Sequence, residues 1–107
     1  MQTWQPATRE EVERRLRAEI TVLHPLHQVR FEAIRVPLRQ VPITSMPGEH
    51  VYVVAEYEGE ILYWSDIEEG WEIDMSNSFD GITERGCNQL GLGHIAHQLF
   101  GDPDALP

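Results

Sequence analysis

The sequence predicts an α+β domain: an antiparallel β-meander of about four strands, with an N-terminal and a C-terminal helix packed on one face. Apolar stripes of helical spacing lie near both ends of the chain, and short alternating segments with a two-residue turn lie between them. With 107 residues, the chain has the usual length of one domain. We therefore expect a single domain over residues 1–107, with a frayed tail over 102–107.

The first helix is predicted from its cap. Thr8 and Glu11 have the spacing of a capping box, so the helix should begin directly after Thr8. Apolar residues follow in steps of four, four and three, which places them on one face: Val12, Leu16, Ile20 and Leu23. Pro25 should end this helix near Leu23, because proline disfavours helical geometry in the residue before it.

The apolar period changes after this helix. Residues 29–33 alternate in a way that predicts a strand ending before Pro37. Proline recurs at Pro37, Pro42 and Pro47. Because proline has no N–H for a central ladder, residues 37–48 should form an edge strand or an extended connection.

A hairpin is the clearest local feature of the chain. Glu58 and Gly59 lie between two apolar segments, and glycine readily supplies the positive φ of a tight turn. We place strands over 50–57 and 61–66. A two-residue turn then sets Val53 opposite Trp64 and Ala55 opposite Leu62 on one face, with Tyr52, Val54 and Tyr63 on the other face.

A further strand and a second helix complete the fold. Alternation over residues 71–75 predicts a third strand of the meander, with Glu72 and Asp74 pointing outward. Asn88 is the expected cap of the last helix, which should end near Gly101. Its apolar stripe consists of Leu92, Ile95, Ala96 and Leu99.

Charge is divided unevenly along the chain. Residues 1–40 hold seven arginines against five glutamates, a net charge of +2, whereas residues 41–107 hold Arg85 alone against thirteen acids, a net charge of −12. A field of that sign attracts basic proteins and repels nucleic acid and anionic lipid. The longest apolar run, 51–55, is far shorter than the roughly 20 residues that span a bilayer. With one cysteine and no secretory signal pattern, the chain is expected in the cytoplasm.

The candidate binding surface follows from this charge. Eight acids fall between Glu56 and Asp74 with no basic residue among them, which indicates either a solubilising surface, a docking face for a basic protein or, less simply, a cation site. Aromatic residues interleave with the acids and could supply contact hot spots. The expected partner-binding residues are Glu56, Glu58, Glu60, Tyr63, Trp64, Asp66, Glu68, Glu69, Trp71, Glu72 and Asp74.

Cys87, His94 and His97 form a second grouping with metal-ligand character. Two histidines three residues apart on a helix can reach one zinc ion together with a cysteine. Both histidines, however, fall on the helix side opposite the apolar stripe, which favours solvent-exposed residues without a metal. Cys87 lies in a negative field that opposes a thiolate, so a buried structural cysteine is expected. The sequence thus indicates no catalytic motif and no cofactor.

The stretch 61–71, followed by Gly81-Ile82 and by residues 87–90, resembles small bacterial proteins, some of them immunity proteins of polymorphic or contact-dependent toxin systems. This resemblance covers about the C-terminal half and implies a small cytoplasmic inhibitor that covers the active site of a basic toxin, such as a nuclease. Two alternatives remain open at this point. The apolar second face of the hairpin could pair with a twin in a structural homodimer, or the chain could be a small zinc enzyme.

Overall fold

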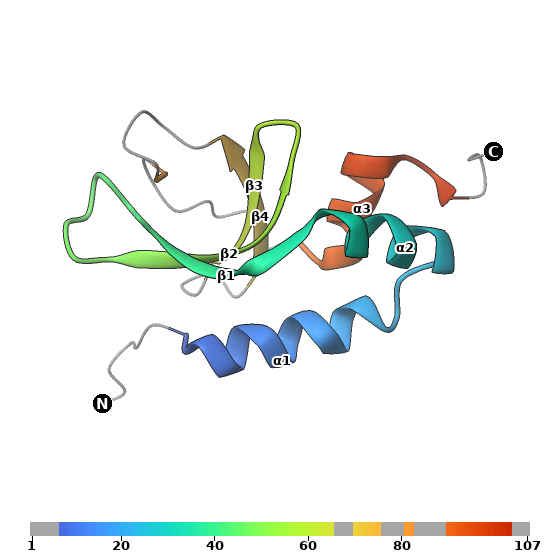
Figure 1. The fold of residues 1–107 in the computed structure, drawn as a ribbon, viewed down its shortest axis with the longest axis horizontal. Helices are drawn as coiled ribbons and strands as arrows, with labels where there is room; N and C mark the ends of the chain where they lie inside the picture. Colours follow the sequence, from blue (N-terminus) through green and yellow to red (C-terminus); the bar gives the residue numbers. More distant parts are fainter. Residues whose placement is uncertain (1–6, 66–69, 76–80, 83–89, 104–107) are drawn as a thin grey trace.

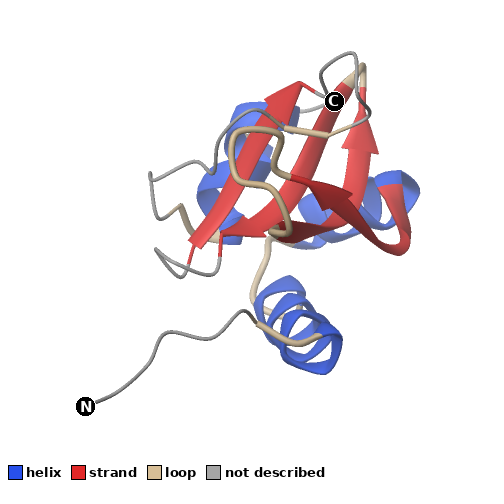
Figure 2. Ribbon diagram, turned by 90° about the vertical axis from the view of Figure 1, so that its left-hand side faces the viewer, coloured by secondary structure: helices blue, strands red, loops and turns tan. Residues whose placement is uncertain are grey.

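The computed structural model describes residues 7–65, 70–75, 81–82 and 90–103. Within them, the helices are α1 (Arg9–Ile20), α2 (Pro25–Ile34) and α3 (Leu92–Phe100). The strands β1 (Arg35–Pro42), β2 (His50–Tyr57), β3 (Glu60–Ser65) and β4 (Gly70–Met75) form one antiparallel sheet in chain order. Figures 1 and 2 show the arrangement of the helices around this sheet. The predicted α+β class and the four-stranded meander are confirmed, and α2 is an additional element.

Helix α1 begins as its capping sequence predicts. The Thr8 side chain accepts a hydrogen bond from the Glu11 backbone N–H at 3.2 Å. All four residues of the predicted stripe are buried: Val12, Leu16, Ile20 and Leu23. The regular helix ends at Ile20, however, and a turn carries the chain to Leu23.

Helix α2 corrects the prediction of a strand over residues 29–33. Pro25 occupies the first turn of α2 and therefore starts a helix, a position where its missing N–H costs nothing. The Nδ1 atom of His24 accepts from the Leu26 N–H at 3.1 Å and caps the helix. His27 and Phe31, one turn apart, are buried, whereas Val29 is 71% exposed. The residues that alternate in the sequence therefore belong to a helix, which buries one short stripe.

Strand β1 lies at one edge of the sheet, as its prolines predict. Pro42 ends the strand, and its carbonyl oxygen accepts from the Ile82 N–H at 3.0 Å. Thr44 N–H donates in turn to the Ile82 carbonyl at 2.8 Å, so the segment at Gly81-Ile82 bonds to the outer edge of the sheet. A Cβ on Gly81 would clash with the Pro42 carbonyl oxygen, so this approach requires glycine.

The β2–β3 hairpin has the predicted two-residue turn. Glu58 and Gly59 have φ values of 49° and 85°, and Tyr57 pairs with Glu60. This is the geometry of a type I′ turn. The predicted pairing of Ala55 with Leu62 is also confirmed.

The predicted pairing of Val53 with Trp64 is wrong. A bulge shifts the register between Val53 and Ala55, so that Val53 pairs with Tyr63 and Tyr52 pairs with Trp64. The extra residue, Val54, is buried in the same cluster as Ala55. Val53 and Val54 do lie on opposite faces, but each is on the face predicted for the other. Val54 is on the face of Ala55 and Leu62, and Val53 is on the face of Tyr63.

The sheet has a buried cluster on each of its two faces. All three helices pack on one face, against a cluster that includes Val54, Leu62 and Trp71. The other face holds a second cluster, formed by Val41, Ile43, Val51, Val53, Ile61, Tyr63 and Ile82. Both faces of the hairpin are apolar, as predicted, but the second face is covered by this chain.

The last helix begins at Leu92, with Gly91 at its N-cap, and not directly after Asn88, which lies outside the described residues. Its predicted stripe is confirmed by the burial of Leu92, Ile95 and Ala96. Pro103 is buried, so the expected frayed tail does not start at residue 102. No described helix combines the length and the apolar character that crossing a membrane requires.

Candidate functional site

The acidic residues between positions 56 and 74 do not form one uniform surface. Glu56, Glu58 and Asp74 are exposed, and Glu60 is half-buried. Glu72, which was expected to point outward, is only 2% exposed. Asp66, Glu68 and Glu69 lie outside the described residues.

The aromatic residues proposed as contact hot spots belong to the core, which corrects the prediction. Tyr63 and Trp71 have no exposed surface, and Trp64 is 7% exposed. The rings of Trp64 and Trp71 meet edge to face, with their centroids 5.0 Å apart, and the Arg15 guanidinium lies 5.0 Å from the Trp64 centroid. These side chains stabilise the fold and cannot anchor a partner on the surface.

Glu72 belongs to the interior because of its register. It pairs with Tyr63, which lies in the cluster on the second face of the sheet. Sequence alternation alone gave its direction as outward, because it assumed that only one face of β4 is buried. Glu72 is therefore buried on the face that Ile43 and Ile82 cover, whereas Asp74, nearer the end of β4 on the same face, is exposed.

Glu56 has a basic neighbour that the sequence pattern did not show. The Arg39 guanidinium, on the adjacent strand β1, forms an ion pair with the Glu56 carboxylate. Both side chains are partly exposed, and pairs of this kind contribute little to stability. The pair nevertheless removes Glu56 from the set of uncompensated carboxylates.

Three carboxylates remain together at the end of the hairpin. Glu58 lies in the turn, Glu60 starts β3, and Asp74 is on the adjacent strand β4, where its neighbour Met75 pairs with Glu60. None of the three forms an ion pair within the part of the chain that the structure describes. Met75 is 64% exposed. We call Glu58, Glu60, Asp74 and Met75 the tip surface.

The tip surface wraps around the end of the sheet. Glu60 and Met75 are cross-strand partners and share the face that the helices cover, whereas Asp74 pairs with Ile61, which belongs to the second face. A hollow of about 300 Å³ lies beside the turn and is lined by Arg39, Glu56, Tyr57, Glu58, Gly59, Glu60 and Ile61. The sequence predicted the charge of this surface but missed Met75, whose exposure depends on its place at the end of the edge strand.

The zinc site considered from the sequence is described only in part. His94 and His97 are exposed, as predicted, and Cys87 lies outside the described residues. The nearest ring to His97 is that of His27, at 4.9 Å between centroids, and the Nε2 atom of His27 lies 2.8 Å from the Gly101 carbonyl oxygen. Among the described residues, no three His, Cys, Asp or Glu side chains are arranged to hold a metal ion.

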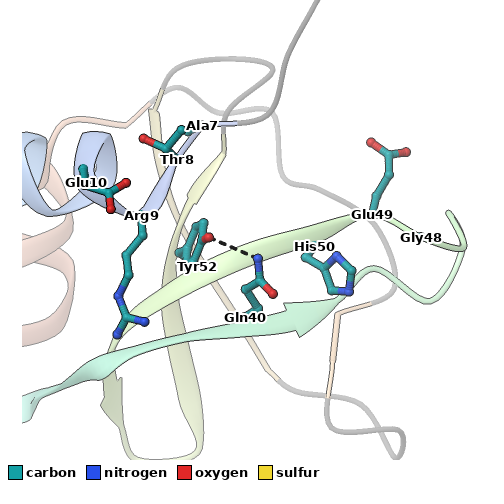
Figure 3. Close-up of a pocket in the computed structure, with 9 residues that line it drawn as sticks. All are labelled: Ala7, Thr8, Arg9, Glu10, Gln40, Gly48, Glu49, His50 and Tyr52. Atoms are coloured by element: carbon teal, nitrogen blue, oxygen red, sulfur yellow. Dashed lines mark hydrogen bonds between the residues drawn. The ribbon is translucent and has the colours of Figure 1, made fainter.

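A groove of about 480 Å³ lies at the other end of the sheet, between the start of α1 and strands β1 and β2 (Figure 3). The Gln40 amide donates to the Tyr52 hydroxyl across its floor, at 3.1 Å. Arg9 and His50 line it together with Glu10 and Glu49, so both signs of charge are present. The Arg9 guanidinium already donates to the Leu38 carbonyl at 3.0 Å. This groove therefore lacks a set of converging groups that would define a reaction.

Comparison with known proteins does not assign a function. No protein-family model, no curated protein and no solved structure matches this chain. The functional argument therefore depends on the geometry of the described residues.

Proposed function

We propose that this protein is an acidic inhibitor of the immunity type, which docks on a basic protein such as a nuclease toxin in the cytoplasm. The observation that supports it is the tip surface, where Glu58, Glu60 and Asp74 occupy the same end of the sheet, without a described ion pair, beside the exposed Met75. Such a grouping has no evident use in holding the fold, because charges of one sign at one end of the sheet repel one another.

The chemistry of the tip surface suits a site that normally holds phosphates. Nucleases bind the phosphate backbone of nucleic acids with arginine and lysine. The three carboxylates of the tip surface carry the same negative charge as those phosphates. Long-range attraction would speed encounter, while the flexible, polarisable side chain of Met75 supplies an apolar contact that adapts to the partner. Covering such a site would block the enzyme without any reaction by this chain.

The test compares two variants with equal net charge. In the first, the tip is neutralised by Glu58→Gln, Glu60→Gln and Asp74→Asn. In the second, Glu10, Glu13 and Glu32 on the helices are changed to Gln. Each protein is used to capture basic partners from the native cell, and binding of the captured partner is then measured at low and high salt.

We expect the tip variant to bind the partner about 30-fold more weakly, which corresponds to roughly 2 kcal/mol for three partly exposed charges. The helix variant should bind within about twofold of the wild type, and wild-type association should slow as salt rises. Inhibition of the partner's activity should be lost together with binding. Equal binding by both variants would mean that the tip surface is not the docking site.

A further inference from the structure

Within the part of the chain that the structure describes, the outer edge of β4 has one main-chain position without a partner. The Trp71 N–H points away from β3 and donates to the Leu90 carbonyl oxygen at 2.8 Å. Main-chain groups of an antiparallel strand alternate in direction from one residue to the next. The backbone N–H and C=O of Ile73 therefore also point away from β3. The next outward N–H, that of Met75, is taken by the Asp74 carboxylate at 2.8 Å. No described residue beyond the β3–β4 pair bonds to the main chain of Ile73.

Among the described residues, a hollow lies beside Ile73. Leu90 bridges Trp71 of β4, and the chain continues from Leu90 through Gly91 into α3, whereas residues 83–89 lie outside the described residues. The hollow has a volume of about 270 Å³ and is lined by Glu60, Glu72, Ile73, Leu90, Gln98 and Leu99. Its aliphatic wall of Ile73, Leu90 and Leu99 can contact apolar side chains. Glu60 lines this hollow and also belongs to the tip surface.

Charge selects among the segments that could add at this edge. A second copy of this chain, with its β4 antiparallel to β4 and Ile73 opposite Ile73, would set Asp74 of each copy opposite Glu72 of the other copy. Such an arrangement is disfavoured by like-charge repulsion. A segment that carries arginine or lysine would instead place cations beside Glu60 and Asp74.

We propose that an extended, basic segment of the partner adds to β4 as a further strand at Ile73. This inference rests on the proposed docking function and specifies its geometry. Side chains of a strand alternate between faces. An apolar partner residue opposite Ile73 would pack in the hollow, and a basic residue next to it would lie opposite Asp74. The recognised segment therefore alternates basic and apolar residues.

Two peptides of equal composition and charge test this geometry. One alternates four arginines with four valines, and the other has the four arginines followed by the four valines. Hydrogen exchange of individual backbone amides in the full chain is measured by NMR with each peptide. The Ile73 amide reports on strand addition, and the Trp71 amide, which is already bonded to Leu90, is the internal control.

We expect the alternating peptide to slow exchange of the Ile73 amide by about tenfold or more, with little change at Trp71. The block peptide should leave Ile73 unchanged. Gln98→Lys, which adds bulk and a cation to the wall of the hollow, should weaken binding of the alternating peptide about tenfold. Ser45→Lys, an equal charge change in the exposed turn after β1, should have an effect below about twofold.

The two proposals fail in different ways. If both peptides bind with the same salt dependence and the Ile73 amide stays unprotected, strand addition is overturned while charge-driven docking stands. If the alternating peptide does not bind, strand addition is also overturned. If both peptides bind equally well to the variant with a neutralised tip, the proposed function is overturned as well.

Discussion

Replacement of Glu19 should destabilise the protein far more than its place on the surface of α1 suggests. One carboxylate oxygen accepts from the indole Nε1–H of Trp71 at 2.8 Å, and the other accepts from the Leu92 N–H at 3.2 Å. Leu92 is the first residue of α3, and the N-cap residue Gly91 has no side chain to bond it. Glu19 on α1 therefore caps α3 and fixes the central tryptophan.

The expected cost follows from these two bonds. Glu19→Ala leaves the buried Trp71 N–H without its acceptor, at roughly 1–3 kcal/mol, and removes the cap of α3, at about 1 kcal/mol. We expect a loss of about 3 kcal/mol in the free energy of unfolding. Glu19→Gln keeps one acceptor oxygen but loses the charge that favours a helix N-terminus, so about half of this loss is expected.

Urea denaturation followed by circular dichroism measures these differences, with an unchanged m-value as the sign that the unfolding transition is comparable. Glu13→Ala is the matched control, because Glu13 is on the same helix and makes only an exposed ion pair with Arg9, at 3.7 Å. Its cost should be below about 0.5 kcal/mol. If Glu19→Ala and Glu13→Ala cost the same, Glu19 does not join the two helices as described.

A double-mutant cycle isolates the indole bond. Trp71→Phe keeps an aromatic ring but removes the N–H donor. In that background, Glu19→Ala should cost about 1.5 kcal/mol less than it does in the wild type. Additive effects of the two substitutions would show that the hydrogen bond to Trp71 contributes nothing to stability.

Two further predictions concern contacts between distant segments, and both are checked by the same denaturation measurement. Gly81→Ala should lower the free energy of unfolding by roughly 1–3 kcal/mol, because the added Cβ would press on a backbone carbonyl of β1. The control Gly93→Ala, where the added Cβ meets open space in α3, should raise it by about 0.5–1 kcal/mol. His27→Leu should lower the free energy of unfolding by about 1–2 kcal/mol, because it leaves the Gly101 carbonyl without its hydrogen bond at 2.8 Å. The exposed control His94→Leu should change the free energy of unfolding by less than about 0.5 kcal/mol. Equal effects within either pair would contradict the corresponding contact.

The candidate site could be predicted from the sequence only in part. The turn at Glu58-Gly59 gave the position of the acidic tip, because glycine at a positive φ and two flanking apolar segments are local features. The neutralisation of Glu56 by Arg39 and the burial of Glu72 were not predictable in this way. Both depend on which strands become neighbours and on how each face of the sheet is covered.

Local patterns by themselves determined the start of α1, the hairpin turn, the edge position of β1 and the buried stripe of α3, because caps, turns, prolines and apolar periods act over a few residues. Only the tertiary structure decided that residues 25–34 form a helix, because the packing of His27 and Phe31 against distant residues outweighs the apparent alternation. It also placed Tyr63 and Trp71 in the core, because the helices cover one face of the sheet and Ile43 and Ile82 cover the other. Those contacts join residues far apart in the chain, which a local pattern cannot specify.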